Sequence, residues 1–239
     1  MTNSYDFLNR WRYMLLAIAL LTLLVVQPIA STFGLMKTLF NVLLVIVMGA
    51  LILAFAADRR WRIVAGVLCG VVAILSLGGQ FLSAAGQTVS VSTGHAIGAA
   101  FFVVMAGKIV FSVIKSQRLS IDGVFGAVCG YLLLGLAWAL AYEMIYATHP
   151  DSFQIAPAAA QQIQRSGESR HLFVYYSFVT LTTLGYGDVT PTSTPARTLS
   201  WFEAMTGQLY LTVLIAGLVG AMVAARPTPN SLVRPPGDK

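Results

Sequence analysis

The chain has 239 residues, of which 57% are hydrophobic and 10% are charged, and its formal net charge is +6. Apolar stretches of about 20 residues recur along it, the length at which a helix crosses a bilayer, and this argues against soluble domains. No run of Lys and Arg interleaved with aromatic residues indicates a nucleic-acid surface. The positive charge is therefore interpreted as membrane topology.

Six transmembrane helices are expected, in an all-α membrane protein. They cover residues 13–33, 38–57, 63–82, 94–114, 123–146 and 199–225. The first stretch is too long for a signal-peptide core, and no convincing cleavage site follows it. An uncharged linker rich in Gly, Ser and Thr is expected at 83–93. Cys69 and Cys129 lie inside spans and are expected to be free, buried thiols.

The basic residues of the short loops predict the orientation of these spans. One side receives ten of them: Arg10, Arg12, Arg59, Arg60, Arg62, Lys115, Arg118, Arg226, Arg234 and Lys239. The other side receives four: Lys37, Arg165, Arg170 and Arg197. This bias predicts a multi-pass protein of the cell membrane with both termini in the cytoplasm.

A polar segment at 149–171 is expected to form an extracellular turret. Its acids, Asp151 and Glu168, either raise the local cation concentration modestly or are simply solvated, and the second interpretation is favoured. The amphipathic run that follows, residues 172–182, is too short to cross a bilayer and too apolar to be a free loop. It predicts a re-entrant helix, a structure tolerated where protein surrounds it.

The next stretch, Thr182-Thr183-Leu184-Gly185-Tyr186-Gly187-Asp188, is unusual for a membrane sequence. Gly185 and Gly187 permit positive φ at little cost. Alternating handed conformations turn successive carbonyls, from Thr183 through Tyr186, toward the same side, with the Thr183 hydroxyl below them. Such oxygens suit a dehydrated alkali cation. Because one chain supplies only a quarter of a ring, four subunits around an axis are expected.

This stretch resembles the selectivity-filter signature of potassium channels, with Leu184 in place of Val. The resemblance implies that Thr183, Leu184, Gly185, Tyr186 and Gly187 form the filter. It further implies that K⁺, the permeant ion, binds at the first four of these residues, and no cofactor is expected. The resemblance also implies a homotetramer in the lipid bilayer that conducts K⁺ passively. The domains expected on this basis are a four-helix N-terminal domain at 1–118, a pore domain at 119–225 and a short cytoplasmic tail at 226–239.

Several residues are expected to support the filter: Thr182, Asp188, Tyr175, Tyr176 and Val179. The two tyrosines either pack a cuff around the filter or anchor the chain at the membrane interface. Asp188 either tethers the filter backbone or caps the turn, and the tether is favoured. Val179 occupies a position where some relatives carry a carboxylate, so filter stability is expected to differ here. Pro191 and Pro195 are expected to stop regular structure before the last span.

The start of the last span, residues 203–210, resembles the inner helix of prokaryotic potassium channels. Gly207 is the gating-hinge candidate by that resemblance, and close packing is an equal alternative. Glu143 and Glu203 are carboxyls within membrane helices and are expected to hold the pore domain together by hydrogen bonds.

The fourth expected span carries Lys108, with Lys115 and Arg118 at its end, and no repeat of basic residues. Opening is therefore expected to depend weakly or not at all on voltage. His95, His149 and His171 are candidate proton sensors or ordinary residues of loops and span ends. The alternatives are a weakly selective cation channel and a transporter or non-conducting scaffold. An enzyme is not expected, because metal-spaced clusters, Gly-x-Ser-x-Gly and phosphate loops do not occur.

Overall fold

The computed structural model describes residues 11–31, 84–115, 121–166 and 169–224, together with positions 47, 50, 51, 60, 63, 64, 66, 67, 70 and 71. Most of the spans expected at 38–57 and 63–82, Cys69, Glu168 and the tail at 226–239 lie outside the described residues.

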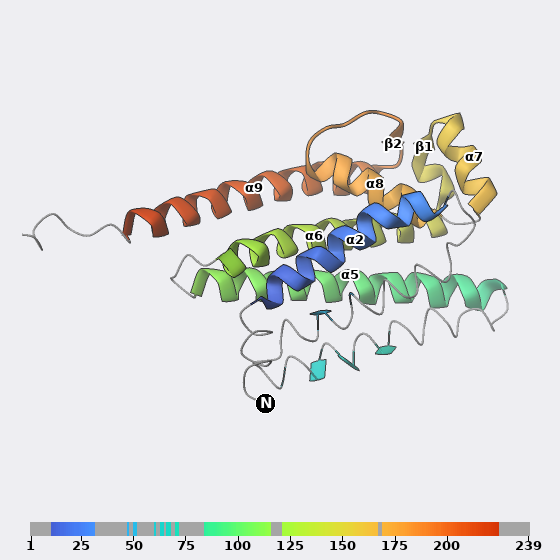
Figure 1. Cartoon of the computed structure of the whole chain (residues 1–239). Coiled ribbons are helices and arrows are strands. Elements are labelled where there is room, and N and C mark those ends of the chain that lie inside the picture. The colour runs from blue at the N-terminus through green and yellow to red at the C-terminus, as the bar shows by residue number, and fades with distance from the viewer. Residues whose placement is uncertain are drawn as a thin grey trace, which may run out of the picture.

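Helices dominate the described part of the chain (Figure 1). The long ones are α2 (Arg12–Ser31), α5 (Ala84–Lys115), α6 (Ile121–Thr148) and α9 (Thr194–Ala224). The short elements between α6 and α9 are η2 (Pro150–Ser152), β1 (Phe153–Ile155), α7 (Pro157–Ser166), α8 (Arg170–Leu181) and β2 (Val189–Pro191). The α6 helix contacts α2, α5, α8 and α9, so it is the element against which the others are positioned.

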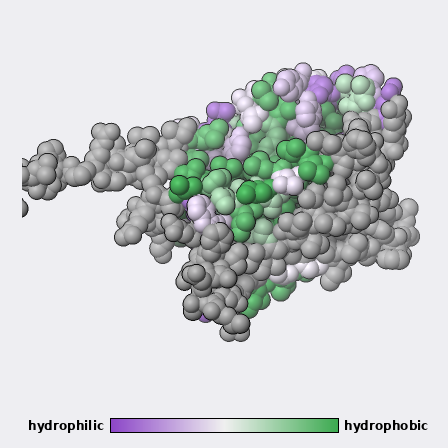
Figure 2. Space-filling model, viewed as in Figure 1, coloured by the Kyte–Doolittle hydropathy of each residue, from purple (hydrophilic) through white to green (hydrophobic). Residues whose placement is uncertain are grey.

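Two helices in the described part are long and apolar enough to cross a membrane, Ser92–Val113 within α5 and Ile121–Thr148, which is α6. They correspond to the spans expected at 94–114 and 123–146. Among the described residues, no helix that meets these criteria of length and hydropathy corresponds to the other four expected spans. On the face that Figure 2 shows, apolar side chains cover much of the described surface along the long helices, and polar ones gather toward the end that carries α7 and the strands.

The prediction of a linker at 83–93 is wrong, because α5 begins at Ala84 and continues without interruption to Lys115. Gly, Ser and Thr are weak helix formers, but they cost less than about 1 kcal/mol each and do not break a helix as proline does. The segment contains no proline. Packing of α5 along α6 therefore outweighs its poor intrinsic propensity.

The two prolines expected to stop regular structure lie inside regular elements instead. Pro191 ends β2, opposite Phe153 in the register of the strand pair. Pro195 is the second residue of α9, where the missing N–H has no helical partner to lose and the fixed φ suits the first turn. The last helix accordingly begins five residues before the expected position 199.

The expected turret is a folded segment rather than a simple polar loop. The β1 strand pairs antiparallel with β2, so Ile155 lies opposite Val189. The backbone N–H of Ala156 donates to the Asp188 carbonyl oxygen at 2.8 Å, and that of Thr192 donates to the Ser152 carbonyl oxygen at 2.9 Å. The segment before α8 is therefore hydrogen-bonded to the chain that leaves the 182–188 loop.

Two apolar cores hold the helices together. The first joins α2, α5 and α6 and includes Leu16, Met105, Ile109 and Leu133. Cys129 is buried in it as a free thiol, as expected. Asp122 Oδ1, in the first turn of α6, accepts the backbone N–H groups of Tyr13 and Met14 at 3.0 and 3.3 Å. This acid therefore satisfies donors at the start of α2, so α2 and α6 begin at the same end.

The second core is aromatic and lies where α6, β1, α8 and α9 meet. Tyr142, Phe153, Phe173 and Tyr176 pack there with ring centroids 5.0–5.8 Å apart, mostly edge to face. That arrangement suits the ring quadrupoles and adds to the free energy of burial. This core positions α8, the helix that leads into the 182–188 loop.

Candidate functional site

The loop that follows α8 has an alternating backbone. Gly185 and Gly187 have φ values of 58° and 79°, as expected. Thr183 also has a positive φ, 61°, which was not expected. This region is strained for a β-branched residue, at a cost of roughly 1–3 kcal/mol. Positive φ therefore occurs at every second residue from 183 to 187.

The amide groups at the start of this loop are bonded back to α8. The N–H of Thr183 donates to the Thr180 carbonyl oxygen at 2.9 Å. The N–H groups of Leu184 and Gly185 donate to the Val179 carbonyl oxygen at 2.9 and 3.4 Å. Val179 was singled out for its side chain, but it is its backbone carbonyl that contacts the loop.

The carbonyl oxygens of residues 183–187 accept no hydrogen bond from the described part of the chain. The side chains of Leu184 and Tyr186 are 59% and 66% exposed. In a single copy of the chain, the loop thus presents a run of strong backbone acceptors that lack a protein donor. Backbone carbonyls are hard oxygen ligands, the type that alkali and other hard cations prefer.

Asp188 has two contacts at the end of the loop. Its Oδ2 accepts the Tyr175 hydroxyl at 2.7 Å, and its Oδ1 accepts the Val189 N–H at 3.1 Å. It therefore both ties the loop to α8 and caps the turn. Partial burial and the hydrogen bond to Asp188 raise the pKa of Tyr175 to about 12, so the donor keeps its proton. The Tyr175 ring also stacks on Tyr186, with an interplanar angle of 7°.

Tyr176 faces away from the loop, toward α9. Its hydroxyl lies 2.7 Å from Ser200 Oγ. Ser200 Oγ also lies 2.8 Å from the Ala196 carbonyl oxygen, so this hydroxyl links Tyr176 to the backbone of α9. The two neighbouring tyrosines thus have different contacts: Tyr175 contacts the loop, and Tyr176 joins α8 to α9.

The C-terminal end of α8 is enclosed by α6 and α9. The Tyr131 hydroxyl donates to the Leu181 carbonyl oxygen at 3.3 Å, and the Thr182 hydroxyl donates to the Phe178 carbonyl oxygen at 2.5 Å. A Cβ placed on Gly207 would overlap the Leu181 carbonyl oxygen. Gly207 is therefore a point of close packing of α9 against α8, and its role as a hinge stays a prediction.

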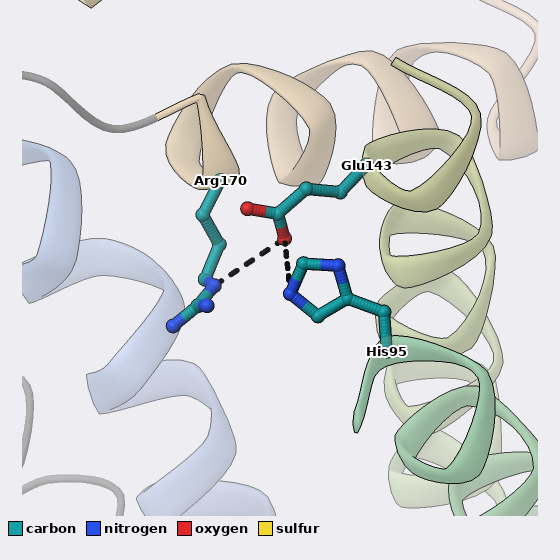
Figure 3. Close-up of polar contacts among 3 residues, drawn as sticks. All are labelled: His95, Glu143 and Arg170. Carbon is teal, nitrogen blue, oxygen red and sulfur yellow. Dashed lines mark hydrogen bonds and ion pairs between the residues drawn. The ribbon is translucent and has the colours of Figure 1, made fainter. Parts of the chain in front are cut away.

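Glu143, near the C-terminal end of α6, joins three helices (Figure 3). Its Oε2 lies 3.5 Å from His95 Nε2 of α5 and 3.4 Å from Arg170 Nε at the start of α8. Glu203 of α9 accepts hydrogen bonds from Tyr142 and Ser177. The expectation that both acids hold helices together by hydrogen bonding agrees with these contacts.

Sequence reasoning missed several residues that matter here, including Tyr131, Tyr142, Arg170 and Ser177. A signal was available for the three hydroxyl residues, Tyr131, Tyr142 and Ser177, because a wholly or partly buried hydroxyl on an apolar helix needs a partner. Their partners are 26 to 61 residues away in sequence, and a single sequence does not reveal which residues meet.

Residues 127–224 match a protein family described as ion channels. The match includes α8, the 182–188 loop and α9 to its last residue. This segment, less than half of the chain, is similar to ion-channel domains. Ion channels are not an enzyme class, in agreement with the expectation that the chain is not an enzyme. Together with the two candidate spans, the match supports a membrane protein. No curated protein and no solved structure matches the chain.

Proposed function

We propose that the chain forms a homotetrameric, potassium-selective channel that conducts K⁺ passively. The observation that carries this proposal is the loop at 183–187, where positive φ alternates along the backbone and the carbonyl oxygens accept no hydrogen bond among the described residues. Residues Thr183, Leu184, Gly185 and Tyr186 supply oxygens that replace the hydration shell of K⁺. The ion-channel domain at 127–224 supports the broader class.

The exposure of the loop favours an assembly of several copies. Leu184 and Tyr186 are exposed in one copy, and so is a series of large apolar side chains on α9: Trp201, Phe202, Met205, Leu209 and Val213. An apolar surface of this kind is covered in the native state by protein or lipid. Four copies around an axis cover the loop and complete the ring of ligands.

The direction of α8 favours a cation at the inner end of the loop. The helix ends at Leu181, immediately before the filter residues. Its C-terminal end carries about half an elementary negative charge from the aligned peptide dipoles. Four such ends aimed at one axis stabilise a monovalent cation in the cavity below the filter.

Six spans with both termini in the cytoplasm are proposed from the distribution of basic residues, and the relative directions of three helices agree with alternating passes. His95 lies near the start of α5 and contacts Glu143 near the end of α6, so these helices are antiparallel. The α2 and α6 helices begin at the same end through Asp122. When a chain crosses a membrane in alternating directions, its first and fifth spans run the same way and its fourth span runs the opposite way. The directions of α2, α6 and α5 match this order. Voltage dependence is proposed to be weak, because α5 carries Lys108 without a repeat of basic residues.

The test is ion flux into liposomes that contain the purified chain. Potassium flux that barium blocks, with a reversal potential that follows K⁺ rather than Na⁺, is expected, together with a tetrameric mass in native mass spectrometry. A reversal potential that tracks both ions equally would favour the weakly selective cation channel. A monomer without flux would refute the proposal.

Tyr175→Phe is expected to release the outer end of the filter. The substitution removes the hydrogen bond to Asp188 and keeps the ring that stacks on Tyr186. A hydrogen bond of this kind contributes about 1 kcal/mol, or about fivefold in the equilibrium between the held and the released loop. Flux should therefore decay faster during sustained conduction. The control is Tyr146→Phe, whose ring packs on Phe173 and which should behave as the wild type.

A further inference from the structure

Glu203 is a fully buried acid, 0% exposed, at the junction of α6, α8 and α9. The Tyr142 hydroxyl of α6 lies 2.6 Å from Glu203 Oε2. Ser177 Oγ of α8 lies 2.5 Å from Glu203 Oε1 and 2.7 Å from the carbonyl oxygen of Gly135 in α6. These contacts form a continuous chain of oxygens that runs from Tyr142 through the carboxyl and Ser177 to Gly135.

The number of protons shared among these oxygens decides whether the Glu203 carboxyl is ionised or protonated. Three short oxygen–oxygen contacts each require a hydrogen between the two atoms, because bare oxygens at these distances repel. Tyr142 and Ser177 each carry a single hydroxyl proton, and the Gly135 carbonyl only accepts. An ionised carboxylate also only accepts, so one contact is left without a hydrogen. A protonated Glu203 supplies it: the acid donates to Ser177, Ser177 donates to Gly135, and Tyr142 donates to the other carboxyl oxygen.

The surroundings of Glu203 contain no compensating positive charge within the described part of the chain. None of the ion pairs found there includes Glu203. The other titratable groups that face it are Tyr131 and Tyr142 from α6 and Tyr176 from α8, all neutral hydroxyls near neutral pH. A buried carboxylate without a cation is unfavourable, and such a group takes up a proton instead.

Gly135 of α6 lies at the end of this row of oxygens, next to Ser177. A Cβ at position 135 would meet the ring of Phe178 at 2.7 Å, so α8 packs against the bare backbone of α6 there. The contact brings the Gly135 carbonyl within reach of Ser177. A change in the donor pattern at Ser177 therefore acts directly on the distance between α6 and α8.

We propose that Glu203 is protonated in the conducting protein and that this neutral carboxyl is a positioning residue, which holds the pore helix α8 through Ser177 against α6 and α9. The flux consequence rests on the proposed channel function. When the proton is lost at alkaline pH, one contact in the chain becomes repulsive and α8 shifts relative to α6. Since α8 ends at the filter loop, the filter then loses its alignment and flux falls.

Glu203→Gln tests the proposal, because the amide reproduces the protonated acid. Its nitrogen donates to Ser177 and its oxygen accepts from Tyr142. Near neutral pH, E203Q should conduct within about twofold of the wild type. As the pH rises, wild-type flux should fall by about fivefold or more, while E203Q should keep its flux. Loss of flux in a folded E203Q tetramer at neutral pH, or an unchanged alkaline response, would overturn the proposal.

The matched comparison is Glu143→Gln. Glu143 is also a buried acid, but it contacts His95 and Arg170, so this variant should keep the alkaline response of the wild type. The comparison separates the loss of the Glu203 carboxyl from the loss of a buried carboxyl elsewhere in the same domain. An E143Q protein that loses the alkaline response would assign the effect to the wrong acid.

Infrared spectroscopy of the full-length protein provides a readout that needs no conduction. The chain has three glutamates, Glu143, Glu168 and Glu203, so carbon-13-labelled glutamate shifts only their bands. We expect a carboxylic-acid C=O band near neutral pH that remains in E143Q, disappears in E203Q and converts to carboxylate at alkaline pH. Its absence from the folded wild type overturns the inference even if E203Q fails to fold. Its presence in a protein without flux supports the protonation and refutes only the proposed channel function.

Discussion

Gly185→Ala is expected to abolish selective potassium flux while leaving the helices folded. Gly185 has a φ of 58°, and nothing lies within 4 Å of the position that a Cβ would occupy in a single copy. The effect therefore arises from the backbone conformation. An L-residue pays roughly 1–2 kcal/mol in this region, and in the proposed tetramer all four subunits incur the cost at one ring of ligands. Liposome flux with mixed K⁺ and Na⁺ measures the result.

The control for this experiment is Gly107→Ala in α5. Gly107 also has open space around its Cβ position, and it lies in an ordinary helix. Alanine is favoured over glycine in a helix by about 1 kcal/mol, so the control should fold and conduct as the wild type. If G185A conducts K⁺ with unchanged preference, the carbonyl-ligand proposal for residues 183–187 is wrong.

Gly207→Ala is expected to destabilise the ion-channel domain. The new methyl group overlaps the Leu181 carbonyl oxygen, a backbone atom at the end of α8 that has little freedom to move. Overpacking of a close contact costs about 1–3 kcal/mol, and relief of the overlap would push α9 away from the 182–188 loop. Thermal unfolding in detergent, measured beside flux, should show a lower midpoint and reduced conduction together.

Gly217→Ala in the same helix is the matched control for Gly207. A Cβ at 217 meets nothing within 4 Å, so this variant should be as stable as the wild type or slightly more stable. The pair also distinguishes the two interpretations of Gly207. If G207A keeps its unfolding midpoint and changes only the open probability, the hinge is favoured over close packing.

The sequence alone determined the features that depend on short-range backbone chemistry. Gly185 and Gly187 predicted positive φ because glycine lacks a Cβ, and both positions have it. The run at 172–182 predicted a short helix, which the structure gives as Arg170–Leu181. The apolar lengths at 94–114 and 123–146 predicted spans that the structure retains as candidates. Each of these signals lies within one element, so no knowledge of distant contacts was needed.

Only the tertiary structure decided which residues face one another. Burial between α6, α8 and α9 joins Glu203 to Ser177 and Tyr142, and strand pairing joins residues 153–155 to the chain that leaves the 182–188 loop. The structure also has a positive φ at Thr183, where local preference opposes it, and a helix over 84–93 despite its weak formers. Local propensities amount to about 1 kcal/mol per residue or less, whereas burial and buried hydrogen bonds contribute more per contact and connect residues far apart in sequence.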